Sequence, residues 1–453
     1  MRNWYGNHKI GIFGLANTGK TVFLTSLLWH LKDHHPDLFP LSDNGRIGGF
    51  EFIESKEHDF NYIKHKNTFI KKHNWPEKTH DYTIAKCKYK ITGSEINVGG
   101  FINKSCNLIT IGLGRQLCER HISFLDIPGE RVADILIWEA KDYHDWVKKL
   151  YRFWENDPEI EKIMGGFSEL ASKPDTKLNQ LVETYKRAMW YMLDACCPMI
   201  TPSTYFLGTD GSMLNDKKYP DRETAIRERS IWSGGELLPL PESWKDLHPL
   251  EYKEMERLFS AYRKQVLKPL FEEINRCDNF IFCIDIPQIL NNGPTNLLYT
   301  QETFLDFIKH LAPGKFKQVR DKLAFNPPRL AYVATKADIV IDKDHLESLL
   351  KDFCAPMHFA GINQKYFICS ACISSEDRMT KNGIKVKVGR DLDNPNNLLV
   401  EPHELPSAFP ANWDPDTFSF QEIAPRPQYA IRPPEQVNLN KVFEFIVEGI
   451  YND

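Results

Sequence analysis

The stretch GLANTGKT, from Gly14 to Thr21, decides the fold that we predict for this chain. It matches the phosphate-loop pattern G-x-x-x-x-G-K-[ST] without a mismatch. The apolar segment HKIGIFG before it predicts a short buried strand, and TVFLTSLLWHL after it has the apolar spacing of an amphipathic helix. Strand, glycine-rich turn and helix together predict a loop that wraps phosphate groups at a helix N-terminus.

The residues of this loop have distinct expected roles. Gly14 and Gly19 would let the backbone turn tightly, so that its N–H groups approach phosphate oxygens. Lys20 would reach the β- and γ-phosphates, and the Thr21 hydroxyl would bind Mg²⁺. The loop residues that we expect to contact the nucleotide are Gly14, Ala16, Asn17, Thr18, Gly19, Lys20, Thr21 and Val22.

A second motif, DIPG from Asp126 to Gly129, ends the apolar strand predicted in RHISFLDIPGE. An aspartate at this place would hold the metal through water, and the glycine would offer its N–H to a γ-phosphate. Glu130 follows, where many GTPases place a glutamine that orients the attacking water. Glu130 would either take that catalytic role or be a solvated side chain. No arginine finger stands out, and the neighbouring Arg131 is the nearest candidate.

A third motif, TKAD from Thr335 to Asp338, follows the predicted strand RLAYVA and concerns the base. Guanine presents two adjacent donors, N1–H and the 2-amino group, which the Asp338 carboxylate would accept together. Adenine would leave that buried carboxylate unpaired. Lys336 would lay its stem over the base and brace the phosphate loop. The alternative is that Asp338 caps the N-terminus of the following helix.

The last motif, CSAC, lies at the end of the predicted strand YFICSA, and there the N–H groups of Ser370 and Ala371 would reach the guanine O6. All of these motifs stand in order, each at the end of a predicted strand, which is the arrangement of the guanine-nucleotide switch fold. Strands alternate with helices along the chain. We therefore predict an α/β protein of the P-loop, GTPase-like type with a mostly parallel sheet.

The domain organisation follows from the spacing, because Asp126 and Asp338 are more than 200 residues apart. We expect residues 1–130 and 277–375 to form the two parts of a GTPase-like domain. Residues 131–276 have mainly helical patterns and would be an insertion. We predict that its core contains the aromatic residues Trp138, Tyr143, Trp146, Tyr151 and Trp154. Residues 376–453 would form an irregular extension whose final helix packs on the core.

The amino-acid composition limits the partners and the cellular compartment that we expect for the protein. The 453 residues carry a net charge of −4, which gives no general attraction to nucleic acid, and we predict no nucleic-acid partner. Ten cysteines are scattered without a disulfide or zinc pattern; Cys369-x-x-Cys372 alone resembles half a metal site. No signal peptide and no transmembrane segment are predicted, so we expect a cytoplasmic protein.

Stretches over nearly the whole chain also carry a family resemblance. They are GLANTGKTVFLTSL, WPEKT at Trp75–Thr79, LDIPGE, ITPSTYFLG, LNNGP at Leu290–Pro294, ATKADIV and NLNKVFEFIVEGI. In these the chain resembles the YcjX-like stress-protein family of bacterial P-loop proteins, usually described as ATPases. The resemblance implies a GTPase-type fold with a helical insertion and a link to stress response. It also implies that Thr79 binds Mg²⁺ in the triphosphate state.

The sequence thus predicts a protein that binds GTP or GDP with Mg²⁺ and slowly hydrolyses GTP. An unknown protein partner would dock through the helical insertion. Two alternatives stay open: an ATPase of the same fold, and a nucleotide-binding scaffold without turnover.

Overall fold

The structure is a computed structural model, and it describes most of the chain. The described residues are 7–41, 46–53, 58–72, 74–76, 81–92, 119–194, 201–202, 222–229, 236–321, 328–359, 362–392, 394, 396–401, 404–414, 417–426 and 432–448. They divide into two compact units. The first comprises Met1–Gly129, Arg276–Asn291 and Gly314–Asp453, and the second comprises Glu130–Asn275 and Asn292–Pro313.

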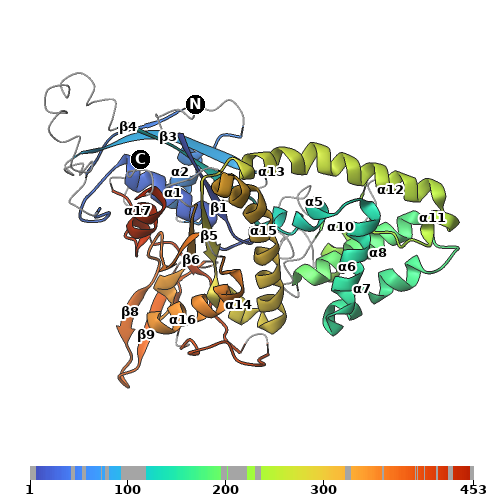
Figure 1. The fold of residues 1–453 in the computed structure, drawn as a ribbon. Helices are drawn as coiled ribbons and strands as arrows, with labels where there is room; N and C mark the ends of the chain where they lie inside the picture. The colour runs from blue at the N-terminus through green and yellow to red at the C-terminus, as the bar shows by residue number, and fades with distance from the viewer. Residues whose placement is uncertain are drawn as a thin grey trace. The chain divides into compact units, whose positions relative to one another are not determined.

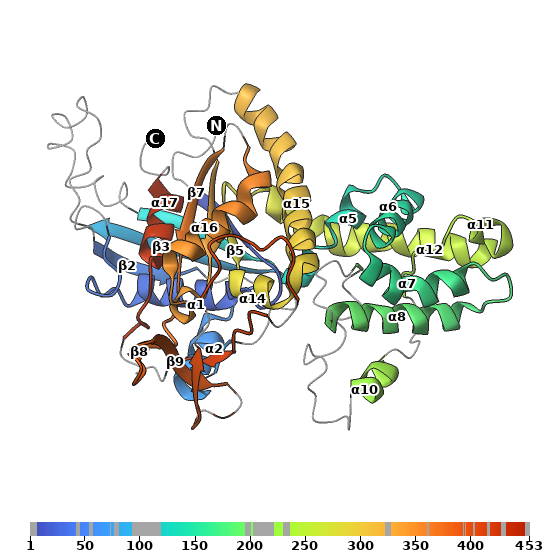
Figure 2. The same ribbon diagram turned by 90° about the horizontal axis from the view of Figure 1, so that it is seen from below.

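A seven-stranded sheet forms the centre of the first unit, in the order β2-β3-β4-β1-β5-β6-β7 (Figures 1 and 2). Its strands are β1 (Asn7–Phe13), β2 (Arg46–Phe52), β3 (Thr83–Thr92), β4 (Glu119–Asp126), β5 (Asn279–Ile284), β6 (Arg329–Ala334) and β7 (Asn363–Ile368). The strands from β4 to β7 are parallel, and β2 and β3 join antiparallel at one edge. The mostly parallel α/β sheet that we predicted is confirmed.

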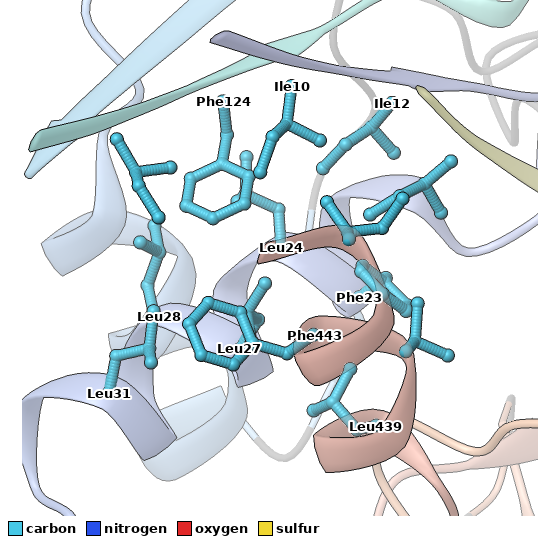
Figure 3. Packing of buried hydrophobic residues seen from close by; sticks show 14 of the residues in the cluster. Ile10, Ile12, Phe23, Leu24, Leu27, Leu28, Leu31, Phe124, Leu439 and Phe443 are labelled. Atoms are coloured by element: carbon cyan, nitrogen blue, oxygen red, sulfur yellow. The ribbon is translucent and has the colours of Figure 1, made fainter. Parts of the chain in front are cut away.

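One face of this sheet packs against the helices α1 (Lys20–Lys32) and α17 (Leu439–Glu448). Ile10 and Ile12 alternate along β1 toward this face and are fully buried. Figure 3 shows them above Leu24 and Leu28 of α1, with Phe443 of α17 beside them. Burying each large apolar side chain contributes about 1.5–3 kcal/mol. The last helix therefore belongs to the main core.

The opposite face carries α16 (Lys343–Cys354), whose buried side chains Leu346, Leu349, Leu350 and Phe353 recur at helical spacing. Phe13 points to this face from β1 and stacks on Phe282 of β5, with ring centroids 5.2 Å apart. Asp342 begins α16 as its N-cap, because its carboxylate accepts from the N–H groups of Asp344 and His345 at 3.0 Å.

Residues 376–426, which we expected to be irregular, contain a second sheet of four strands. Its strands are β8 (Glu376–Met379), β9 (Lys385–Asp391), β10 (Leu398–Glu401) and β11 (Ile423–Ala424). The segment IKVKVG, whose sequence predicts a hairpin, supplies the turn into β9 and most of that strand, which pairs antiparallel with β8 (Figure 1). Lys387 of β9 reaches Asp377 of β8 at 2.6 Å.

The second unit is helical. Its helices between Ile135 and Asn275 are α5 (Ile135–Glu139), α6 (Tyr143–Glu155), α7 (Pro158–Ala171), α8 (Leu178–Asp194), α10 (Arg222–Arg229), α11 (Trp244–Leu247), α12 (Pro249–Tyr262), the π-helix η4 (Arg263–Leu267) and α13 (Lys268–Asn275). Tyr143, Trp146 and Trp154 of α6 are buried, as expected of a core. Trp138 is half-buried and stacks on Phe271 at 4.7 Å.

The remaining helices are α2 (Tyr62–Asn67), the π-helix η2 (Thr68–Lys72), α14 (Ile286–Asn291), α15 (Gly293–Asp321), and the 3₁₀ helices η3 (Gly129–Arg131), η5 (Ala337–Ile339) and η6 (Ala355–Met357). Of these, α15 belongs to the second unit as far as Pro313. Among the described residues, no helix is long and apolar enough to cross a membrane. The segment NLITIGLG, residues 107–114, whose sequence predicts a strand, lies outside the described residues.

Candidate functional site

The sheet topology points to one edge of the first unit. The chain leaves β1 toward the β2–β3–β4 side and later builds β5, β6 and β7 on the other side of β1. In open parallel sheets, ligands bind beyond the carboxyl ends of the strands where the order reverses in this way. The loop after β1, the end of β4 and the loops after β6 and β7 all lie at those carboxyl ends, because these strands run parallel.

The glycine-rich loop, Gly14–Thr21, has a conformation that requires its glycines. Gly14 has a φ of 154°, and a Cβ there would lie 2.5 Å from the Cys283 carbonyl oxygen. Gly19 has a φ of 83° and forms the N-cap of α1. Asn17 also adopts a left-handed conformation, with a φ of 66°, and is exposed. The turn therefore depends on residues that accept positive φ values.

Lys20 is held by the same loop. Its Nζ donates to the carbonyl oxygens of Gly14 at 2.8 Å and Leu15 at 2.7 Å. The side chain is largely buried, and Thr18 also donates its hydroxyl to the Leu15 carbonyl at 2.9 Å. These contacts curl the loop around the ammonium group. Lys20 is thus a buried cation at the start of a helix, a combination that suits an anion.

Thr21 and Asp126 come together from α1 and from the end of β4. The Thr21 hydroxyl donates to Asp126 Oδ2 at 3.3 Å, and Asp126 is fully buried. A hydroxyl and one carboxylate are a set that fits Mg²⁺, which usually keeps waters and takes its other ligands from substrate phosphates. These two residues would hold such an ion.

Gly129 lies directly against the glycine-rich loop. A Cβ at this position would be 2.1 Å from the Ala16 nitrogen and 2.3 Å from the Leu15 carbonyl carbon. Only glycine fits so close to that backbone. Gly129 and Glu130 open the 3₁₀ helix η3, but the structure does not describe the Glu130 side chain, so its two alternatives stay open.

Arg131, the nearest candidate for an arginine finger, is engaged within the helical unit. Its Nη1 donates to the Tyr262 hydroxyl at 2.6 Å and lies 3.6 Å from Asp134 Oδ2. Tyr262 in turn donates to the same Asp134 oxygen at 2.7 Å, and Asp134 is fully buried. This arrangement favours a structural role for Arg131.

Thr335 and Lys336 follow β6. Thr335 donates its N–H to the Ile284 carbonyl at the end of β5, at 2.9 Å. Lys336 has a φ of 57°, and its Nζ contacts Asp285 Oδ2 at 2.5 Å. Burial lowers the pKa of Lys336, but attraction and hydrogen bonding by Asp285 outweigh burial and raise it. The ammonium thus stays charged. Its observed brace is Asp285, where we had expected the glycine-rich loop.

Asp338 is buried in the 3₁₀ helix η5, with 5% of its surface exposed. Its carboxylate accepts hydrogen bonds from Ser370 and from Ser374 and Ser375. The helix cap that we had weighed for Asp338 belongs to Asp342 instead. Asp338 is thus a carboxylate enclosed by serines, on the carboxyl side of the sheet.

Ser370 and Ala371 are the first residues of the serine segment, Ser370–Ser375. The Ser370 N–H donates to the Val437 carbonyl at 3.1 Å, which leaves the Ala371 N–H as the candidate donor for a base oxygen. The Ala371 carbonyl accepts from the Ser26 hydroxyl of α1. The helix after the glycine-rich loop is therefore tied to the serine segment.

A family model described as YcjX-like family, DUF463, matches residues 8–450. The chain belongs to this family. The match spans the described residues of both units, and it confirms the resemblance that we inferred from the motifs. No curated protein matches the chain.

The site of this YcjX-like chain also contains residues that sequence reasoning missed. Ser374 and Ser375 contact the Asp338 carboxylate, but two serines between an isoleucine and a glutamate carry no signal by themselves. Asp285, which pairs with Lys336, directly follows the buried strand β5. An acidic residue at the end of a buried strand is the same signal that pointed to Asp126, so Asp285 was open to prediction.

Two metal-related expectations have different outcomes. Thr79, which the family resemblance assigned to Mg²⁺, lies outside the described residues. Within the described part of the chain, no group of three or more His, Cys, Asp or Glu side chains is placed to hold a metal ion. Cys369 and Cys372 are buried thiols outside any disulfide, and burial raises the pKa of each.

Proposed function

We propose that this YcjX-like protein binds GTP and GDP with Mg²⁺ and slowly hydrolyses GTP, as a molecular switch related to stress response. The observation that carries the proposal is the convergence of Lys20, the Thr21–Asp126 pair and Asp338 at the carboxyl edge of one parallel sheet. A phosphate-binding cation, a Mg²⁺ ligand pair and a base acceptor are the parts that a nucleotide site needs.

The phosphate end of the proposed site has the stronger support. Lys20 rests on the Gly14 and Leu15 carbonyls, so its ammonium is already inside the loop where β- and γ-phosphates would lie. Bound Mg²⁺ would neutralise phosphate charge, held by Thr21 and, through water, by Asp126. Gly129, packed on the loop backbone, would offer its N–H to the γ-phosphate.

The base end favours guanine over adenine. Asp338 does not cap α16, since Asp342 does, so the ATPase alternative loses the helix-capping role that it needed for Asp338. A buried carboxylate suits the two donors of guanine and opposes adenine, which has no such pair of donors. Lys336, fixed by Asp285, would lay its stem over the base plane.

For hydrolysis, the residues would act by position and charge. Lys20 would stabilise the charge that develops on the leaving phosphate, and Glu130 would orient the attacking water. Thr79 and Gly129 would link the γ-phosphate to the order of their loops. Without an arginine finger, intrinsic turnover is expected to be very slow. A protein partner that docks on the helical insertion would then supply or trigger the missing step.

Calorimetric titration of nucleotide-stripped protein with GDP and with ADP, each with Mg²⁺, tests the proposal. We expect GDP to bind at least about a hundredfold tighter, about 2.7 kcal/mol. Equal affinities, or a preference for ADP, would return the protein to the ATPases. Single-turnover GTP hydrolysis followed over hours then separates a slow enzyme from a scaffold, because a scaffold would leave the GTP intact.

A further inference from the structure

The Asp338 carboxylate is already surrounded by donors of its own chain. Oδ1 accepts from the Ser370 hydroxyl at 2.5 Å. Oδ2 accepts from the Ser374 N–H and hydroxyl, both at 2.7 Å, and from the Ser375 N–H at 3.2 Å. An ionised carboxylate offers about four lone-pair positions. These four hydrogen bonds therefore use the positions that the two donors of guanine would need.

The serines that donate to Asp338 are buried, and their hydrogen bonds to the carboxylate are strong. Asp338 is 5% exposed, Ser370 1%, Ser374 5% and Ser375 3%, so water does not compete for the carboxylate. Hydrogen bonds to an ionised group are roughly twice as strong as neutral ones. A guanine base that enters this site must displace some of these donors. Oδ2 accepts three of the four hydrogen bonds, so the displaced donors include those on Oδ2.

The segment that supplies these donors is anchored from the C-terminal part of the chain. Ser370 and Val437 exchange two backbone hydrogen bonds, and the Ile373 N–H donates to the Glu435 carbonyl at 2.9 Å. The Ser375 carbonyl accepts from Arg426 Nη2 at 2.6 Å. Arg426, Glu435 and Val437 thus hold the serine segment against Asp338.

We propose that Ser374 is a specificity-determining residue, which occupies the Oδ2 positions of Asp338 that guanine would take. Guanine then binds only when Ser374 moves away from the carboxylate. The strength of the Ser374 hydrogen bonds therefore determines the ratio of the GDP affinity to the ADP affinity. This inference rests on the proposed function.

The substitution Ser374→Ala tests the proposal, because it removes the hydroxyl donor and keeps the N–H. Ser348→Ala is the matched control, since the exposed Ser348 hydroxyl of α16 donates to the Asp344 backbone carbonyl, outside the site. The probes are GDP and ADP with Mg²⁺, titrated into the full chain. We expect Ser374→Ala to bind GDP about tenfold tighter than the unchanged protein, with ADP unaffected and Ser348→Ala within about twofold for both.

Hydrogen exchange in the unchanged protein gives a second readout that does not depend on a variant. The Ser374 and Ser375 amides donate to Oδ2, so they should exchange slowly in the free protein. GDP should speed their exchange if guanine displaces them. Protection that stays the same with saturating GDP would overturn the proposal.

The outcomes separate this inference from the proposed function. If the unchanged protein prefers GDP to ADP and both serine variants behave alike, the role of Ser374 is wrong and guanine binding stands. If ADP binds at least as well as GDP to the unchanged protein, both are wrong. A GDP preference that is present in the unchanged protein and grows in Ser374→Ala supports the role of Ser374.

Discussion

The glycine-rich loop and the surroundings of Asp338 lie at the same edge of one sheet but are built in different ways. The loop is a single run of eight residues, and Lys20 finds its contacts on Gly14 and Leu15 within that run. Asp338 draws its contacts from a segment that begins 32 residues later, and that segment is anchored near Val437. The first site is local, whereas the second is assembled from distant parts of the chain.

This difference predicts which part of the site, the phosphate end or the base end, a substitution should affect. Lys20 takes hydrogen-bond acceptors from its own loop, so a change at Lys20 should act mainly on phosphate binding. An assembled site also depends on the packing of its distant anchors. Changes at Asp338 should therefore alter both base choice and stability.

The largest expected effect belongs to the local loop. Replacing Lys20 with Ala removes the cation that rests on Gly14 and Leu15, so GTP and GDP affinity should fall by at least about a hundredfold. Isothermal titration measures it. Lys173→Ala is the control, because Lys173 forms an exposed pair with Glu169 and its loss should change neither binding nor stability measurably. Unchanged GDP binding in Lys20→Ala would remove the loop from the nucleotide site.

Gly129→Ala probes the contact between the end of β4 and the loop. The new Cβ would lie 2.1 Å from the Ala16 nitrogen, so the loop or η3 must shift. We expect a loss of stability of about 1–3 kcal/mol and a lower rate of GTP hydrolysis. Thermal unfolding and single-turnover assays measure these effects. Gly165→Ala, in helix α7 with no atom within 4 Å of its Cβ, should instead be neutral or slightly stabilising.

Asp338→Asn tests the assembled site. The new amide group would face the Ser374 and Ser375 donors with an N–H group, so we expect a loss of stability of about 1–3 kcal/mol. GDP affinity should fall about tenfold or more, while XDP gains, because the 2-carbonyl of xanthine can accept from an amide. Titrations with both nucleotides and a melting curve measure these changes. A GDP affinity that stays the same would show that Asp338 does not contact the base.

The smallest effect concerns acidity in α1, the helix that starts in the local loop. Burial lowers the pKa of His30 to about 4, although the Pro434 carbonyl raises it. His30 ionises readily only when unfolded, so stability should fall as the pH drops below about 6.5, by about 1 kcal/mol between pH 6.5 and 5.5. Denaturant unfolding at both pH values measures this. In His30→Leu this fall in the free energy of unfolding between pH 6.5 and 5.5 should be absent. If the variant keeps the same pH dependence, His30 is not its source.

The contrast also explains how much the sequence could predict. The strand–loop–helix around Lys20 and the Thr21–Asp126 pair could be read from spacing, because each motif contains its own geometry. The contacts of Asp338 could not be predicted from the sequence. Ser374 reaches the Asp338 carboxylate only because its segment pairs with Val437 in the folded chain. The edge strand β2 was missed because RIGGFEF contains two glycines and stands in a polar region.

Three buried thiols around the candidate site give the molecule a chemical reporter. Cys283 lies under Gly14, and burial raises its pKa to about 12 despite nearby Lys20. Cys369 and Cys372 flank Ser370 and Ala371, and both are buried. Since the thiolate is the reactive form, these cysteines resist alkylation while the fold is closed. Peptide mapping after brief alkylation would therefore show which part of the fold has opened. Modification at Cys372 alone would indicate that the serine segment has detached, and modification at Cys283 would indicate that the core has unfolded.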